Sequence, residues 1–271
     1  MLPPAAHRAA PLVEIRPEAE RHVIRRNLPG HARSRCAFTI VVPAYNEQLQ
    51  LEATVDRIVT LLDGVSDYEI VIVEDGCTDS TPLIADWLTK KYSHVQHIHS
   101  RVRLGKGLGV MEGMRVARGE VIVLMDADLS TDPDRLLECI ARVREGEADI
   151  LIGSRYHEES DTRRTPLRKL LSVTYNVAAR VLLGSRLKDH QCGFKIFDER
   201  AVRSILPFVR SHRFFWDTEV LAIAQWHGYR IQEVPVVWKE GKETKVRLLR
   251  TPIEMFGNMV RLAMARRRLS P

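Results

Sequence analysis

The sequence predicts an α/β protein with a mostly parallel sheet that is covered by helices on both faces. Short, nearly continuous apolar runs alternate with segments whose apolar residues recur at helical spacing. Apolar runs without polar alternation indicate strands buried on both faces, as in parallel sheets. Acidic residues directly follow two of these runs. Because ligands of such sheets bind beyond the carboxyl ends of the strands, we expect a nucleotide site at that edge.

The elements follow one another regularly in the first half of the chain. Strands are expected from apolar runs at residues 38–42, 70–73, 95–98, 121–125 and 150–152. Helical spacing predicts the intervening helices over residues 51–62, 83–88, 110–117 and 136–143.

The second half is less regular and shows no sign of a second domain. Helices are expected over residues 167–183 and 218–226, and strands over residues 194–197 and 231–238. Thr251 and Pro252 suit the N-cap and first position of a last helix. We therefore divide the chain into a poorly ordered basic arm, one α/β domain and an amphipathic C-terminal helix, at residues 1–35, 36–250 and 251–271.

The composition favours anionic partners. The 271 residues carry a net charge of +6, which suits nucleotide phosphates or an acidic membrane surface. Nucleic acid is not expected, because interleaved aromatic residues and known binding motifs are missing. No run of about 18 apolar residues and no signal-peptide pattern is present. We expect a cytoplasmic protein that is attached peripherally to the cytosolic face of a membrane.

Asp126-Ala127-Asp128 is the most informative triplet for chemistry. The two carboxylates follow a buried strand and can reach one hard cation, Mg²⁺ or Mn²⁺, which keeps open positions for phosphate oxygens. Such an ion would neutralise a diphosphate leaving group. The alternative is one aspartate that caps a turn beside one in a solvated loop.

Two further clusters suit a nucleotide. Asp75 stands at a strand end, where it can accept a hydrogen bond from a base N–H, and Asp79 or Ser80 would cap the next helix. Arg103 and Lys106 belong to a glycine-bearing loop before a helix, where backbone amides and a lysine suit phosphate.

These motifs, in this order, resemble the GT-A glycosyltransferases of family 2. The motifs of the first half are Val42 to Glu47, Glu74 to Gly76, Arg103 with Lys106-Gly107, and Met125 to Leu129. The second half is similar to the dolichyl-phosphate glucose and mannose synthase branch at residues 153–155, 189–195, 216–219, 233–236 and 241–246. Over residues 37–250 the resemblance implies a Rossmann-like GT-A fold and a metal-dependent hexosyltransferase.

The resemblance also implies roles for individual residues. Contacts to the nucleotide-sugar would come from Pro43, Ala44, Tyr45, Glu47, Asp75, Lys106, Asp126 and Ala127. The metal would be held by Asp126, Asp128 and Ser130, although the mannose branch often has Gln in place of this serine. The acceptor phosphate would be gripped by Arg155, Arg168, Ser172 and Lys245. The residues expected to carry catalysis are Asp126, Asp128, Arg155 and Asp217.

Simpler roles stay open for several of these residues. Arg155 could pair with a nearby acid, and Arg168 could lie on a solvated helix face. Asp217 and Glu219 are two residues apart at a helix start, so they do not share a helical face, and one would cap the helix while the other serves the acceptor. His190 is expected to be a loop or core histidine.

The implied acceptor explains why no strong general base is needed. A phosphate monoester has a second pKa of about 6 and is largely dianionic at neutral pH, so it can attack the anomeric carbon directly. The resemblance implies inversion, which gives a β-linked polyprenyl phosphate sugar. Glucose from UDP-glucose is favoured because residues 191–195 are closer to the glucose branch; mannose from GDP-mannose is the alternative.

Two other functions and two positions of the last helix stay open. The chain could be a family 2 transferase with a saccharide acceptor, or a non-catalytic module that binds nucleotides or polyanions. The last helix combines apolar residues with clustered arginines, which suits an anionic membrane interface. A helix packed on the core with a basic, solvated end would have the same composition.

Overall fold

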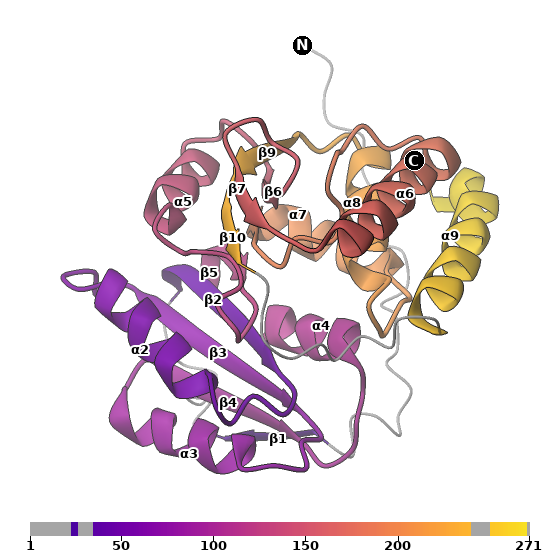
Figure 1. Cartoon of the computed structure of the whole chain (residues 1–271). Coiled ribbons are helices and arrows are strands. Elements are labelled where there is room, and N and C mark those ends of the chain that lie inside the picture. Colours follow the sequence, from indigo (N-terminus) through magenta and orange to yellow (C-terminus); the bar gives the residue numbers. More distant parts are fainter. Residues whose placement is uncertain (1–22, 27–34, 240–249, 270–271) are drawn as a thin grey trace.

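The computed structural model describes residues 23–26, 35–239 and 250–269. An eight-stranded sheet runs through the molecule (Figure 1). Its order is β1 (Val23–Arg26), β4 (Val95–Ser100), β3 (Tyr68–Asp75), β2 (Cys36–Ala44), β5 (Gly119–Leu124), β8 (Lys195–Asp198), β6 (Ile150–Ser154) and β9 (Ile231–Pro235). β1 and β8 are antiparallel to their neighbours, and the other strands run in one direction. The predicted α/β class is confirmed.

Two strand predictions need correction. Val23–Arg26 belong to the expected disordered arm, yet they form β1 by pairing with the edge strand β4; the rest of the arm before residue 35 lies outside the described residues. The single strand expected over 231–238 is two strands, β9 and β10 (Val237–Lys239). Between them Val236 donates its N–H to Ser160 Oγ, and β10 then pairs with β7 (Asp161–Arg163) in a separate small sheet.

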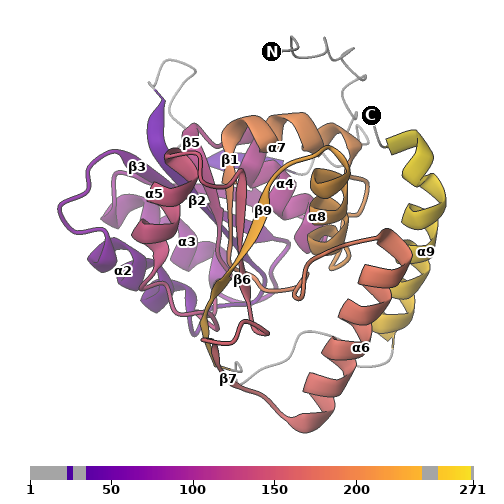
Figure 2. The same cartoon turned by 90° about the horizontal axis from the view of Figure 1, so that it is seen from above.

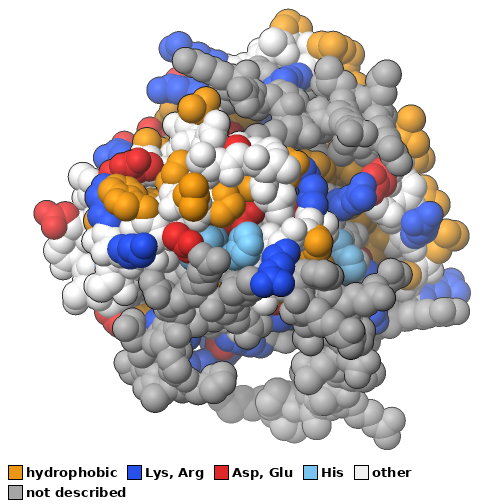
Figure 3. Space-filling view, turned by 90° about the horizontal axis from the view of Figure 1, so that it is seen from below, with side chains coloured by type: hydrophobic (Ala, Val, Ile, Leu, Met, Phe, Trp, Pro, Cys, Tyr) orange, Lys and Arg blue, Asp and Glu red, His pale blue; other side chains and the backbone are white. Residues whose placement is uncertain are grey.

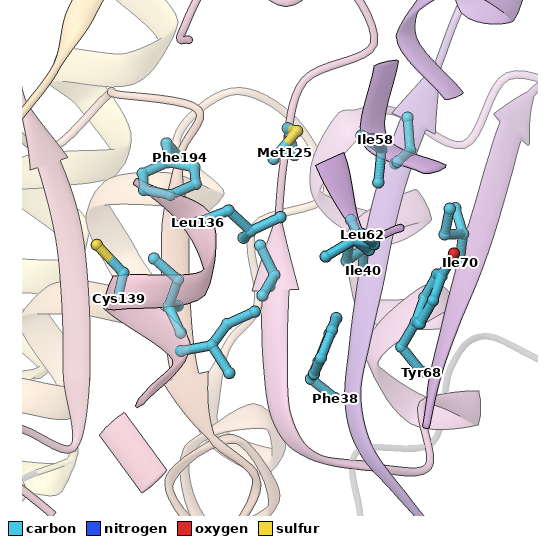
Figure 4. Packing of buried hydrophobic residues seen from close by; sticks show 14 of the residues in the cluster. Phe38, Ile40, Ile58, Leu62, Tyr68, Ile70, Met125, Leu136, Cys139 and Phe194 are labelled. Carbon is cyan, nitrogen blue, oxygen red and sulfur yellow. The ribbon is translucent and has the colours of Figure 1, made fainter. Parts of the chain in front are cut away.

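One face of the sheet is covered by α2 (Leu51–Leu61), α3 (Thr81–Lys91) and α5 (Leu136–Arg144), as Figure 2 shows. Their apolar faces pack on side chains that alternate along β2 and β3, including Phe38, Ile40 and Ile70 (Figure 4). The rings of Phe38 and Tyr68 stack at 5.6 Å between neighbouring strands. The helical spacing read from the sequence is thus the spacing of this buried face.

The opposite face is covered by α4 (Lys106–Val116), α7 (Glu199–Ile205) and α8 (Trp216–Trp226). The absence of a side chain at Gly113 lets α4 pack closely on the strands: a Cβ at this position would stand 2.5 Å from Val41 Cγ1. α7 and the short 3₁₀ turn η1 (Leu206–Phe208), which follows it, were not predicted. They complete the cover over β5 and β8.

α6 (Pro166–Leu183) and α9 (Arg250–Leu269) lie side by side and pack outside α8 (Figures 1 and 2). α9 begins at Arg250, so Thr251 is inside the helix and is not its N-cap. Pro252 falls in the first turn, where its missing N–H costs no helical hydrogen bond. Among the described residues, no helix is both long and apolar enough to cross a bilayer.

Candidate active site

A pocket of about 350 Å³ lies at the carboxyl edge of the sheet, beyond the ends of β2, β3, β5 and β6. The chain segments that line it are far apart in the sequence. The predicted site residues among its walls are Pro43, Ala44, Tyr45, Glu47, Asp75, Lys106, Asp126, Ala127, Asp128, Ser130, Arg155, Arg168 and Asp217. Of the other predicted residues, Ser172 lies outside the lining and Lys245 falls in the stretch that the structure does not describe.

Asp75 is held at the end of β3 by the loop before α4. Its carboxylate accepts hydrogen bonds from the backbone N–H groups of Leu104 and Gly105, the latter at 2.9 Å. Burial raises the pKa of Asp75, although these N–H donors and Arg103 act in the opposite direction. Arg103 stacks on the Tyr45 ring with its Cζ 3.3 Å from the ring centroid. The loop therefore orients both an acid and a planar cation at this end of the pocket.

A chain of alternating charges crosses the floor of the pocket. Lys106 Nζ lies 2.9 Å from Asp126 Oδ1 and 3.7 Å from Asp217 Oδ2, and Lys195 Nζ lies 2.6 Å from Asp217 Oδ1. Burial opposes the ionisation of Asp126, but the adjacent Lys106 ammonium outweighs it and lowers the pKa of the carboxyl group. Burial alone would lower the pKa of Lys106, yet the two aspartates raise it. Both Asp126 and Lys106 are therefore charged at neutral pH.

Gly193 makes room for the carboxylate of Asp126. A Cβ on this glycine would stand 1.8 Å from Asp126 Oδ2 and 2.3 Å from its Cγ. No side chain can occupy that space without displacing the aspartate, so glycine is required here for packing and not for an unusual φ.

The loop after β5 fixes the second aspartate of the triplet. Asp128 Oδ1 accepts the backbone N–H of Ser130 at 2.9 Å, across Leu129, which has a φ of +47°. The Ser130 carbonyl in turn accepts from the Lys239 N–H at 2.8 Å. Thr54 Oγ1 donates to the Ala127 carbonyl at 2.6 Å. The triplet is thus held from α2 on one side and from β10 on the other.

Arg155 pairs with an acid, as the simpler interpretation of this residue proposed. Its Nε and Nη2 lie 2.7 and 2.8 Å from the two carboxylate oxygens of Asp189, and its backbone N–H also donates to Asp189. Burial opposes ionisation of Asp189, but the guanidinium outweighs it and lowers the pKa of Asp189 to about 2. The pair fixes the plane of the guanidinium, which still lines the pocket beside Trp238.

Of the two acceptor residues predicted on α6, only one lines the pocket. Arg168 lines the pocket, whereas Ser172, one turn further along α6, accepts a hydrogen bond from the Tyr156 hydroxyl at 2.6 Å. Ser172 therefore positions Tyr156 in this structure.

Two smaller predictions can be assessed directly. Glu219 accepts from the backbone N–H groups of Arg210 and Ser211, so it holds the loop before α8 while Asp217 faces the pocket. His190 is a core histidine: it is buried, and its ring nitrogens contact Asn176 and Ser185 at 2.8 Å.

Sequence reasoning gave no role to several residues of the site. Asp189, Gly193 and Lys195 were noted only as parts of a motif, and the pocket walls also include Gln191, Phe214 and Trp238. A usable signal did exist for Lys195, since this charge directly precedes the apolar residues Ile196 and Phe197 of a strand, and a buried charge needs a partner. The partner itself, Asp217, is 22 residues away and could not be inferred.

The sheet order, the cover of helices and the acidic pocket at the carboxyl edge define the class as the GT-A glycosyltransferase fold. Glucosyl-3-phosphoglycerate synthase from Mycobacterium tuberculosis, in complex with Mn²⁺ and UDP-glucose, matches with a TM-score of 0.63 and 18% identity. The match covers 85% of this chain and 79% of that protein. The sequence model of the family "Glycosyl transferase family 2" matches residues 39–206, and the chain belongs to this family.

Curated relatives lie within the same family. Glycosyltransferase AglD of Haloferax volcanii is 40% identical over 226 residues, which are 82% of this chain but only 36% of that protein. Dolichyl-phosphate beta-glucosyltransferases of Dictyostelium discoideum and Homo sapiens are 32% and 31% identical; the matches cover 83% and 77% of this chain and 73% and 69% of those proteins. The chain thus spans about a third of AglD. The expected family is confirmed.

Proposed function

We propose that this protein transfers a hexose, glucose from UDP-glucose, to a polyprenyl phosphate of the dolichyl type. The observation that carries the proposal is a single pocket in which Asp126 and Asp128 share the walls with Arg155 and Arg168. Such a pocket can hold two anions together, which a transfer to a phosphate acceptor requires. The names of the dolichyl-phosphate beta-glucosyltransferase relatives support glucose over mannose.

Asp126 and Asp128 would hold a divalent cation, Mg²⁺ or Mn²⁺, with the Ser130 hydroxyl as a further oxygen nearby. The donor set fits a hard cation, and the absence of a side chain at Gly193 leaves room for the Asp126 carboxylate. When bound, the ion would supply positive charge to the diphosphate leaving group. Lys106, which contacts Asp126, would stabilise the same charge from the protein side.

The acceptor would react as a phosphate dianion. One of its oxygens attacks the anomeric carbon, the bond from that carbon to the diphosphate oxygen breaks, and the nucleoside diphosphate leaves with the electron pair. No side chain has to remove a proton. Arg155 and Arg168 would offset the repulsion between acceptor and donor phosphates, and Asp217 would position Lys106 for the donor. Attack from the opposite side gives the β-linked product.

The lipid tail of the acceptor would follow α6. Arg168 lines the pocket, while its neighbours Leu167 and Leu170 are each 63% exposed. α9 beside it buries Met255, Met259 and Leu262 against the core and exposes Ile253, Phe256 and Met264. One face of α9 therefore packs on the core, and the other face presents apolar side chains that a membrane contact would use. We infer that α6 and α9 form a peripheral contact with the cytosolic face of an anionic membrane.

A donor and acceptor matrix tests the reaction. UDP-glucose and GDP-mannose are each incubated with polyprenyl phosphate or with a saccharide panel, in Mg²⁺, Mn²⁺ or chelator, and products are identified by mass. The proposal expects a glucosyl lipid phosphate only with UDP-glucose and a divalent ion. A mannosyl product would select the GDP-mannose alternative, and a glycosylated saccharide would select the other acceptor class. Absence of nucleoside diphosphate release in every arm would leave a binding module.

Liposome flotation tests the membrane contact. The wild-type chain should float with anionic vesicles, and a Leu170→Glu, Phe256→Glu double variant should remain in the bottom fraction. Leu83→Glu is the control, because Leu83 is 71% exposed, more than either replaced residue, but lies on α3, on the other side of the sheet. Equal flotation of the double variant and wild type would exclude α6 and α9 as the contact.

A further inference from the structure

Three potential ligands gather away from the pocket, on the side of β3 and β4 that faces α3. Glu74 and His99 are directly opposite each other in the two strands. His97 precedes His99 by two residues, so both imidazoles lie on the same face of β4. One ligand atom from each of the three residues lies within 4.8 Å of the other two. Neighbouring Asp75 points to the other face, toward the loop before α4.

His97 has an unsatisfied nitrogen in this cluster. Its side chain is fully buried, and its Nε2 has no hydrogen-bond partner among the described residues. Leaving a buried polar atom without a partner destabilises the fold, so such atoms call for a ligand or a functional reason.

The other nitrogen of His97 is oriented as in a metal site. Nδ1 lies 2.8 Å from Asp86 Oδ1 on α3. A carboxylate on one imidazole nitrogen fixes the tautomer and directs the lone pair of the other nitrogen toward a cation, as in carboxylate–histidine–zinc triads. Asp86 thus keeps the Nε2 of His97 in the unprotonated form that can donate its lone pair to a cation.

We propose that Glu74, His97 and His99 bind one Zn²⁺ ion, with Asp86 supporting His97 from outside the coordination shell. Imidazole and carboxylate donors suit zinc, and three protein ligands leave a fourth tetrahedral position for water. Ligand bonds of about 2.0–2.1 Å place tetrahedral donor atoms about 3.3 Å apart. The ligand atoms of the three residues lie within 4.8 Å of one another, so small side-chain rotations would bring them to this spacing.

The surroundings agree with an accessible site of three ligands. The His99 side chain is 21% exposed, which gives an ion a route from solvent. The underside of the molecule, where α3 and β1 lie in Figure 1, has histidine side chains at its surface (Figure 3). Cys77 does not belong to the group: its sulfur accepts the Asn46 N–H and donates to the Ala44 carbonyl.

The ion would join β3 to β4 next to the nucleotide end of the pocket. Glu74 Oε1 also accepts the Cys77 N–H, so a metal on Glu74 would stiffen the turn that follows Asp75. Its role would be to hold that turn, and it would be distinct from the cation of Asp126 and Asp128.

Metal titration of the full chain tests the site. The protein is stripped with a chelator, Zn²⁺ is added, and bound metal is counted by mass spectrometry and calorimetry; Co²⁺ serves as a spectroscopic substitute. Asp128→Ala disables the other cation site, so the ligand variants are made in this background. We expect Asp128→Ala to bind one equivalent of Zn²⁺ and to give an intense visible band with tetrahedral Co²⁺. No saturable Zn²⁺ binding by Asp128→Ala would overturn the proposal, independently of whether the glucosyl transfer occurs.

Variants then assign the ligands. His97→Asn should lose the bound equivalent, His99→Asn should weaken binding at least tenfold, and Asp86→Asn should weaken it by about 10–100-fold. His94→Asn is the matched control, since His94 precedes the same strand but contacts Tyr68 instead. Unchanged Zn²⁺ affinity in both His97→Asn and His99→Asn would also sink the idea. Circular dichroism confirms that each variant is folded before it is titrated.

Discussion

Replacement of Lys195 by methionine should show how strongly the buried charges at the site depend on one another. Lys195 is 0% exposed, and its ammonium lies 2.6 Å from Asp217 Oδ1 and also donates to the Cys192 carbonyl. Methionine has a similar length but no charge, so among the cations that the structure describes Asp217 would keep Lys106, 3.7 Å from its other oxygen. Removing one partner of a buried pair costs about 3–5 kcal/mol. Because Lys106 remains, we expect a loss near the lower end, about 3 kcal/mol.

Urea denaturation followed by tryptophan fluorescence measures this loss. Arg135→Met is the matched control: it breaks the Arg135–Glu138 pair, whose side chains are 46% and 48% exposed, and should cost less than about 1 kcal/mol. A Lys195→Met, Asp217→Leu double variant should recover part of the stability, because no unpaired charge is then buried. A single variant within about 1 kcal/mol of wild type, or a double variant with no recovery, would refute the reasoning.

Three further predictions follow from the site. Gly193→Ala should destabilise the fold by about 1–3 kcal/mol and reduce turnover at least tenfold, because its Cβ would meet the Asp126 carboxylate; Gly257→Ala, with no atom within 4 Å of its Cβ, should do neither in the same denaturation and transfer assays. Asp128→Ala should lower kcat/KM about 10³-fold with an unchanged melting temperature, and a small effect would remove Asp128 from the reaction. Burial lowers the pKa of His190 from 6.5 to about 4, so its contribution is complete above pH 6.5 and is lost as the pH falls toward 4. Between pH 7 and pH 5 the free energy of unfolding should fall by about 2 kcal/mol more in wild type than in His190→Gln, and parallel pH profiles would contradict this.

Most of the sheet could be predicted because its signal is local. Strands buried on both faces must be apolar throughout, so the runs that contain Ile40, Ile72 and Val123 stand out without any knowledge of their neighbours. Weak pairings were harder to predict. β1 contains Arg25 and Arg26 and exists only because the edge of β4 offers a partner, and β10 depends on β7 in the same way.

The pocket residues also differ in whether local sequence or contacts between distant segments decide their place. Asp126 and Asp128 follow a strand directly, so their place at the sheet edge follows from chain order alone. Arg155 lines the pocket, and its pairing with Asp189 was only one of two open interpretations, since the two residues are 34 positions apart. The cluster of Glu74, His97 and His99 was not foreseen, because the register of β3 against β4 decides which side chains meet.

The sequence by itself determined the α/β class and the family and directed attention to the carboxyl edge as the candidate site, because hydrophobic periodicity and strand-end motifs are properties of neighbouring residues. Only the tertiary structure decided which charges pair, which glycine makes room for Asp126 and which face of α9 is buried. Those outcomes depend on distances of a few ångströms between segments far apart in the chain. In the low-dielectric interior, the interaction energy of two charges changes strongly with such distances.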